Sequence, residues 1–240
     1  MEAKLRFLHG VLLLCLWLSA PALSPAQDAP KVPKPAQLVT REQWGSEPQP
    51  IPEQRKHTPK YITLHHAGVD YKPGTDPAKF VKSMQSWGQR EKHWPDLAYH
   101  FLIAPDGRIF EARRLEYEPE SNTQYALSGH IGVELMGNFE TQRPSEQQLQ
   151  STVALVAWLC QAQHIDPSQI AGHRDRAPLQ TACPGKDFYR YLKSGEFVGW
   201  VKNTLAGKTP TVKSGPPLEG GPTVPVGHRP PAATGAKAEN

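Results

Sequence analysis

The alternation of hydrophobic and polar positions predicts short strands and amphipathic helices through the middle of the chain. Residues 61–66 (YITLHH) form a short, largely apolar run, and the apolar residues within 131–135 recur at every second position, as in β-strands. Between these two runs, residues 76–91 carry apolar side chains at helical spacing. Strand and helix signals therefore alternate along the chain.

Turn and capping signals extend this pattern. The apolar stretch 98–104 and residues 108–112 flank a Pro-Asp-Gly sequence, which predicts a β-hairpin. Ser145, followed three positions later by Gln148, is a capping box that opens a helix. A last helical segment is expected over residues 187–205. We therefore predict an α/β fold, a single domain with a central mixed β-sheet flanked by helices.

The N-terminus has the pattern of a signal peptide. Lys4 and Arg6 precede the apolar run 11–18, and alanines suited to cleavage follow it. The run is shorter than the roughly 20 apolar residues that a membrane span needs. An uncleaved anchor is the alternative. We expect residues 1–26 to be removed and the protein to be exported to the periplasm or secreted outside the cell, without stable membrane insertion.

Proline and glycine mark the two segments that flank the predicted domain. Residues 27–39 carry three prolines and two lysines, which is typical of an extended linker. Residues 207–240 contain seven prolines, six glycines and no aromatic residue. Because such a segment buries too little surface to offset its ordering entropy, we predict a disordered tail. The folded domain is then expected over residues 40–206.

The charge balance is only mildly basic. There are 27 Lys and Arg residues against 23 Asp and Glu residues. No basic run interleaved with aromatic residues marks a nucleic-acid surface, and export also argues against a nucleic-acid partner. We expect a monomer.

Three residues form a candidate metal site. His173 lies in the sequence Gly-His-Arg-Asp, Cys183 follows ten positions later, and His65 ends the apolar run far upstream. Two imidazoles and one thiolate are a three-ligand zinc set, and three protein ligands leave the fourth position open to water. The set therefore indicates a catalytic rather than a structural Zn²⁺.

Strand alternation separates the two adjacent histidines. His65 shares a face with Thr63, whereas His66 lies on the face of Ile62 and Leu64. Only one histidine should reach a polar cleft, so we expect His65 to be the ligand and His66 a packed, hydrogen-bonded neighbour. The alternative is that both are structural histidines of the strand.

The remaining cysteine and a strand glutamate complete the candidates. Cys160 lies in an apolar stretch and is expected to be a buried core residue, although a Cys160–Cys183 disulfide is an alternative. Glu134 sits between Val133 and Leu135, so its carboxylate faces either solvent or a working cleft. A carboxylate beside an activated water is the usual proton acceptor.

Five motifs in order resemble a known family. They are TREQWG (40–45), ITLHH (62–66), WPDLAYHFLI (94–103), DGRIFEAR (106–113) and GVELMGNF (132–139), followed by the Gly-His-Arg-Asp motif. Over about residues 38–195 the chain resembles the zinc-dependent N-acetylmuramoyl-L-alanine amidases, which share a fold with the peptidoglycan recognition proteins.

The resemblance implies a substrate and a set of roles. Zinc would be bound by His65, His173 and Cys183, and zinc-activated water would cleave the amide between N-acetylmuramic acid and the L-alanine of the peptidoglycan stem peptide. Glu134 and Tyr99 both match positions of proton-transfer groups. On intrinsic pKa we favour Glu134 as the base and Tyr99 as an oxyanion donor.

One position departs from the strongest catalytic pattern, and one supports catalysis. Thr181 aligns with a position that is lysine or threonine in active members, where lysine would be the stronger oxyanion partner. Cys183 is the residue that non-catalytic recognition members typically lose. A non-catalytic module that binds peptidoglycan or muropeptides is the alternative function. A zinc peptidase of another fold lacks the helical His-Glu-x-x-His motif.

Overall fold

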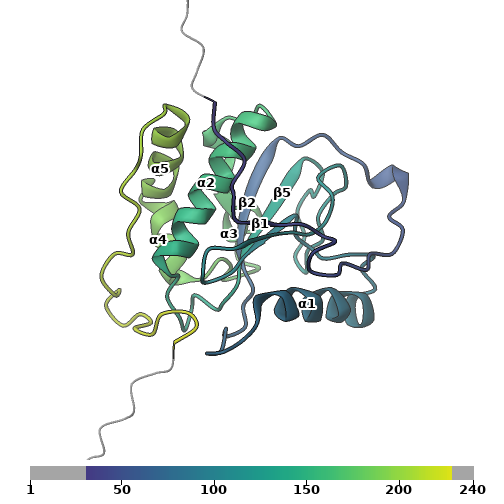
Figure 1. Ribbon diagram of the computed structural model, residues 1–240, viewed down its shortest axis with the longest axis horizontal. Coiled ribbons are helices and arrows are strands. Elements are labelled where there is room, and N and C mark those ends of the chain that lie inside the picture. The colour runs from purple at the N-terminus through teal and green to yellow at the C-terminus, as the bar shows by residue number, and fades with distance from the viewer. Residues whose placement is uncertain (1–30, 229–240) are drawn as a thin grey trace, which may run out of the picture.

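A mixed six-stranded sheet forms the centre of residues 31–228, the part of the chain that this computed structural model describes (Figure 1). The strand order is β1-β4-β3-β5-β2-β6; only the β3–β4 pair is antiparallel. The strands are β1 (Leu38–Val39), β2 (Tyr61–His66), β3 (Phe101–Ile103), β4 (Ile109–Glu111), β5 (His130–Leu135) and β6 (Ile170–Gly172). The predicted signal peptide lies outside the described residues.

Helices cover both faces of the sheet, which confirms the predicted fold class. The longer ones are α1 (Pro77–Lys92), α2 (Glu146–Ala162), α4 (Lys186–Lys193) and α5 (Glu196–Leu205), and the single turn α3 (His173–Arg176) follows β6. In Figure 1, α2, α4 and α5 gather on one side and α1 lies on the other. Short 3₁₀ turns span Glu53–Arg55 and Pro167–Gln169. No helix among residues 31–228 is long and apolar enough to cross a membrane.

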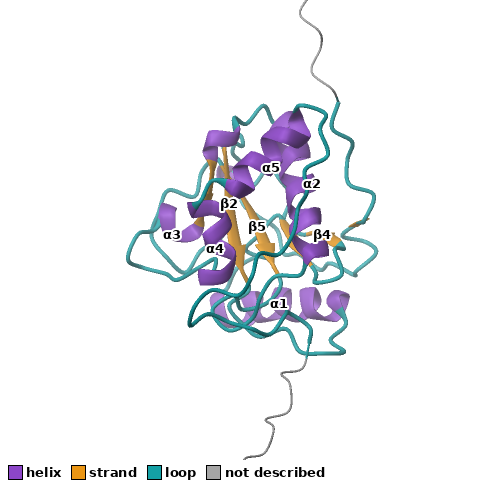
Figure 2. Cartoon of the chain, turned by 90° about the vertical axis from the view of Figure 1, so that its left-hand side faces the viewer, coloured by secondary structure: helices purple, strands orange, loops and turns teal. Residues whose placement is uncertain are grey.

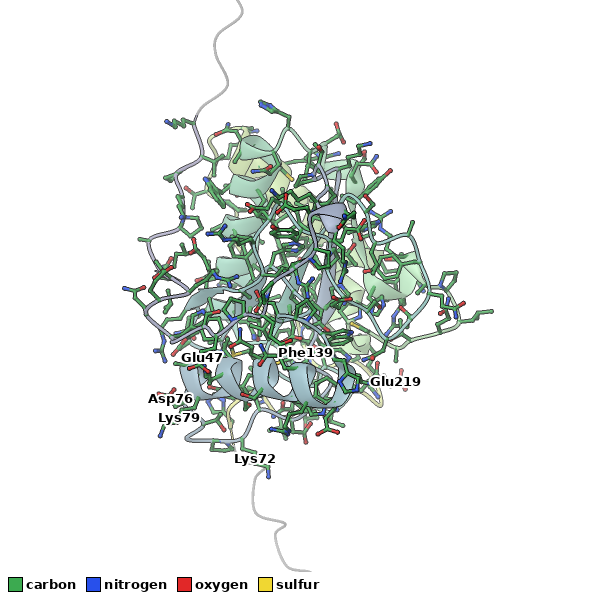
Figure 3. All side chains as sticks on the ribbon, turned by 90° about the vertical axis from the view of Figure 1, so that its right-hand side faces the viewer. Glu47, Lys72, Asp76, Lys79, Phe139 and Glu219 are labelled. Atoms are coloured by element: carbon green, nitrogen blue, oxygen red, sulfur yellow. The ribbon has the colours of Figure 1, made fainter. Side chains whose placement is uncertain are left out.

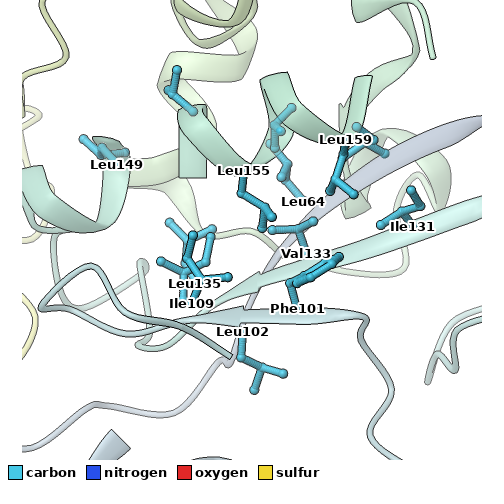
Figure 4. Close-up of a cluster of buried hydrophobic side chains, with 14 of the residues drawn as sticks. Leu64, Phe101, Leu102, Ile109, Ile131, Val133, Leu135, Leu149, Leu155 and Leu159 are labelled. Atoms are coloured by element: carbon cyan, nitrogen blue, oxygen red, sulfur yellow. The ribbon is translucent and has the colours of Figure 1, made fainter. Parts of the chain in front are cut away.

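The hydrophobic core lies between the sheet and α2. Val133 and Leu135 point toward Leu155 and the other apolar residues of α2, while Leu102 points to the opposite face (Figure 4). Alternation along β5 therefore sends its apolar side chains toward α2 and leaves Gly132 and Glu134 on the face that carries the candidate site.

One capping contact and one helix boundary differ from the sequence prediction. Ser145 caps α2 by accepting the Gln148 N–H at 3.0 Å, as predicted. The Gln148 side chain, however, donates to the carbonyls of Ile103 and Met136, and so ties α2 to the sheet instead of completing the box. The single helix expected over 187–205 is two helices, because Gly195 takes a left-handed conformation with φ of 78°.

The predicted flanks need correction where they are described. Residues 31–39 are extended, but β1 pairs with β4 and Val32 is buried, so the packed domain begins before residue 40. The prediction of a disordered tail is wrong for residues 207–228. Val212 and Val226 of this segment are buried in the core, and the backbone of Arg143 pairs with it. Residues 229–240 lie outside the described part.

Candidate metal centre

Parallel pairing of β2 with β6 brings the two candidate histidines together. The carboxyl ends of neighbouring parallel strands meet at one edge of the sheet, where sites of open α/β sheets lie. His65 lies near the end of β2, and His173 is the first residue of α3, directly after β6. The two rings are 4.5 Å apart between centroids. Figure 2 shows α3 beside this end of β2.

Cys183 reaches the same point from the loop between α3 and α4. Its Sγ lies 3.6 Å from Nδ1 of His65, and one ligand-type atom from each of His65, His173 and Cys183 lies within 4.8 Å of the others. All three residues are buried. Two nitrogens and one sulfur at this spacing suit Zn²⁺, which binds both donor types in tetrahedral sites. The residues present thus fit the metal that the sequence predicts.

The Cys183 loop is held by neighbouring backbone and side-chain groups. Arg174 donates its backbone N–H to the Cys183 carbonyl at 2.9 Å and its guanidinium to the carbonyl of Ala182. Thr181 Oγ1 accepts the Cys183 N–H at 3.0 Å. The His66 N–H points at Sγ, 3.4 Å away. These contacts fix the thiol beside the two imidazoles.

A cavity of about 290 Å³ opens over the three residues. Tyr99, Thr181 and His66 are part of its wall, and Glu134 is not. The complete lining is His65, His66, Ala67, Gly68, Trp94, Tyr99, Glu120, Ser121, Asn122, Thr123, His173, Gln180, Thr181 and Cys183. Of the three predicted catalytic residues, Tyr99 and Thr181 therefore face the space in which a substrate would bind.

Glu134 lies beside His65 within the sheet. The two are register partners in the parallel β2–β5 pair, and Glu134 is fully buried. Burial raises the pKa of this carboxyl well above its usual range, and a hydrogen bond from the Tyr99 side chain partly opposes the rise. The half-buried Tyr99 also has a raised pKa, chiefly from burial and then from the neighbouring Glu134. At neutral pH the Tyr99 hydroxyl therefore holds its proton.

His66 and Cys160, the histidine and cysteine outside the candidate metal site, have their own contacts. The Phe139 N–H donates to Nδ1 of His66 at 3.1 Å, as expected for a packed neighbour, and burial lowers the pKa of His66 to about 4. Cys160 and Cys183 are both free and buried, so the alternative of a disulfide between them is wrong.

Sequence reasoning missed the polar loop that covers His173. Thr123 Oγ1 lies 2.6 Å from Nε2 of His173, and Ser121 Oγ lies 3.3 Å from the same nitrogen. A partner on one ring nitrogen fixes the orientation of the ring and leaves the other nitrogen for a metal. The only sequence signal was the polar composition of this loop, which has no periodicity.

Three exposed apolar side chains lie next to residues of the cavity wall. The exposed large hydrophobic residues of the described chain are Val69, Trp87 and Leu179. Val69 follows the lining residue Gly68, Leu179 precedes Gln180, and the Trp87 ring packs edge-on against Trp94, with centroids 6.1 Å apart. Leu179 has a positive φ of 64°, a strained conformation that collects at functional sites.

A buried histidine behind the site gives a pH prediction. His100 Nδ1 accepts the Gly132 N–H at 2.9 Å, and burial lowers the pKa of His100 from 6.5 to about 3. Because the folded state prefers the neutral ring, His100 makes its full contribution to the free energy of unfolding above pH 6.5. That contribution is lost as the pH falls toward 3. When the pH falls from 7 to 5, we expect the preference for neutral His100 to lower the free energy of unfolding by about 2 kcal/mol.

Urea unfolding at several pH values measures this loss. The His100→Asn variant keeps an acceptor for Gly132 but no longer titrates, so its stability should fall less between pH 7 and pH 5. An identical pH dependence in both proteins would show that His100 is not responsible.

The chain is similar to a family of known activity. The sequence profile of the N-acetylmuramoyl-L-alanine amidase family matches residues 55–186. Peptidoglycan-recognition protein LB of Drosophila melanogaster is 28% identical over 179 residues, covering 70% of this chain and 73% of that protein. Peptidoglycan recognition protein 1 of Bos indicus is 28% identical over 194 residues, covering 78% and 92%.

A solved structure agrees with these sequence matches. A variant of Drosophila PGRP-LB in complex with tracheal cytotoxin superposes with a TM-score of 0.57 at 26% identity, covering 66% of this chain and 94% of that one. The family profile spans more than half of the chain, including His65, His173 and Cys183. The chain therefore belongs to the N-acetylmuramoyl-L-alanine amidase family.

Proposed function

We propose that this protein is an exported zinc hydrolase that cleaves the amide bond between N-acetylmuramic acid and the L-alanine of the peptidoglycan stem peptide. The observation that carries the proposal is the convergence of His65, His173 and Cys183 within 4.8 Å beneath an open cavity. A family profile named for this activity and a relative solved with tracheal cytotoxin support the choice of substrate.

The three residues would hold the metal, and each has a distinct support. His65 is fixed by the strand, His173 by the hydroxyl of Thr123, and Cys183 by the Arg174 and Thr181 contacts. When bound, zinc would polarise the scissile carbonyl and lower the pKa of a water molecule. Thiolate ligation requires Cys183 to lose its proton, whereas burial alone raises the pKa of this thiol to about 12. Metal binding should therefore release a proton.

The cavity wall supplies the polar groups that bind the reacting amide. The Tyr99 hydroxyl keeps its proton at neutral pH and can donate a hydrogen bond to the oxygen that gains charge. The Thr181 hydroxyl accepts from Cys183 N–H, and its own proton remains available to the substrate. Both groups act as donors in this arrangement.

Digestion of purified peptidoglycan tests the proposal. We expect the zinc-loaded protein to release free stem peptides with a new L-alanine amino terminus, and a chelator to stop the release. Products are identified by mass after separation of the soluble fraction. Binding to peptidoglycan without release under zinc-replete conditions would instead establish the alternative, a non-catalytic module that recognises muropeptides.

A further inference from the structure

A short loop joins the two chain segments that carry His65 and Cys183. We define the bridging loop as residues 137–143, which follow β5. Its Gly137 carbonyl accepts the N–H of Gly68, and its Phe139 N–H donates to Nδ1 of His66. His66 and Gly68 are the first and third residues after His65. The bridging loop therefore holds the segment that leaves the first candidate ligand.

The same loop holds the segment that follows Cys183. The Phe139 carbonyl accepts the N–H of Asp187 at 3.0 Å. A β-carbon at Gly185 would lie 2.6 Å from the Phe139 carbonyl carbon, so the two backbones are in direct contact. Any outward shift of Phe139 would thus loosen both segments at once.

The C-terminal strap, which we define as residues 208–228, presses on the bridging loop from outside. Arg143 of the loop donates its N–H to the Val224 carbonyl and accepts the N–H of Val226. A β-carbon at Gly137 would lie only 2.8 Å from Cγ2 of Val226, so this valine fills the space that the glycine leaves. Val226 is 1% exposed. The strap runs past α5 and α4 to reach this place (Figure 1).

An ion cluster fastens the strap at a second point. Asp187 is fully buried, and its carboxylate lies 3.6 Å from Nε of Arg143 and 3.9 Å from a terminal nitrogen of Arg190. The two guanidinium groups donate to strap carbonyls, Arg143 to Gly215 and Arg190 to Pro216. The strap therefore accepts a hydrogen bond from one terminal nitrogen of each guanidinium group. Figure 3 labels Phe139 of the bridging loop within the molecule and Glu219 of the strap at its margin.

We propose that the strap is a positioning element of the metal site, and that Val226 is the residue through which it acts. Val226 supports Gly137, the bridging loop transmits that support to the segments of His65 and Cys183, and their spacing sets metal affinity. The family profile ends at residue 186, so this element lies beyond the part of the chain that the family match describes. The proposal rests on the zinc site proposed above.

A pair of valine variants tests this role. Val212 and Val226 are both buried in the strap, but only Val226 contacts the bridging loop among the contacts described. Val226→Ala should lower Zn²⁺ affinity about fivefold in chelator competition, below the roughly 10- to 100-fold known for groups that touch a metal ligand directly. Val212→Ala, with the same loss of two methyl groups, should keep wild-type affinity. Equal affinity in both variants would overturn the proposal.

The spectrum of the Co²⁺-loaded protein gives a readout that stability alone does not move. Its visible bands report the geometry of the ligands, and we expect them to change in Val226→Ala and not in Val212→Ala. A shared drop in thermal stability with unchanged spectra would show that the strap only stabilises the fold.

Hydrogen exchange on the unaltered chain tests the same coupling without a variant. Linkage is reciprocal, so a strap that favours zinc binding must itself be favoured by zinc. The amides of Val226 and Gly227, which donate to Arg143 and Tyr71, should exchange more slowly in the zinc-loaded protein. Equal exchange rates with and without bound zinc would refute the coupling. Absence of zinc binding by the unaltered protein would refute the site itself, and is thereby distinguished from failure of the strap proposal.

Discussion

Replacing Cys183 by serine should abolish stem-peptide release and lower Zn²⁺ affinity by more than about 100-fold, the upper end of the loss seen when only a supporting residue of a metal ligand is removed. A serine hydroxyl does not ionise at neutral pH and is a harder donor, so the site would keep two imidazoles and lose its only charged ligand. Zinc affinity by chelator competition and product release from peptidoglycan measure the two effects.

The second buried thiol provides the matched control. Cys160 is 2% exposed and free, as Cys183 is free, but it lies on α2 away from the cavity. Cys160→Ser should bind zinc and release stem peptides as the unaltered protein does. Circular dichroism should show both variants folded, since a serine at 183 can still accept the N–H of His66. Retained zinc binding and hydrolysis in Cys183→Ser would remove the cysteine from the ligand set.

Much of the fold could be predicted because burial imposes a regular period on each element. Alternation along residues 61–66 distinguished His65 from His66, and the structure places His65 beside His173 and Cys183 while His66 bonds to Phe139. The parallel β2–β6 pair that joins His65 to His173 links residues more than a hundred positions apart. No local pattern specifies such a pair, and the family resemblance supplied it.

The features that escaped prediction lack periodicity. Thr123 reaches His173 from an irregular polar loop, so its role depends on tertiary geometry alone. The strap is rich in proline and glycine, and this composition does not reveal that two of its valines, Val212 and Val226, are buried. Its backbone is ordered by partners from distant residues such as Arg143. Composition indicates how much apolar surface a segment can bury by itself. Here the rest of the domain provides the surface against which the strap packs.

Tyr99 and Glu134 are the two candidates for proton transfer, and the geometry separates them. Tyr99 lines the cavity, and its ring centroid lies 4.8 Å from that of His65. Glu134 is fully buried behind it, with the Tyr99 side chain as its hydrogen-bonding neighbour and no ion pair among the described residues. We therefore expect Tyr99→Phe to lower kcat about 100-fold, the loss typical of one oxyanion donor. Glu134→Gln, which keeps the size of the side chain, should lower kcat less than about tenfold.

Tyr125→Phe is the control for loss of a tyrosine hydroxyl near the same histidines. The Tyr125 ring lies 5.6 Å from that of His173, but the residue is not part of the cavity wall, and its hydroxyl has no hydrogen-bond partner among residues 31–228. The kcat of the Tyr125→Phe variant should match that of the unaltered protein. Zinc content must be equal in all three variants, so that kcat reports the step after metal binding. If Glu134→Gln lost as much kcat as Tyr99→Phe, the carboxylate would be the base that the sequence favoured. Tyr99 would then only orient it, because a tyrosine whose pKa is raised by burial and by a neighbouring carboxyl cannot accept the proton itself.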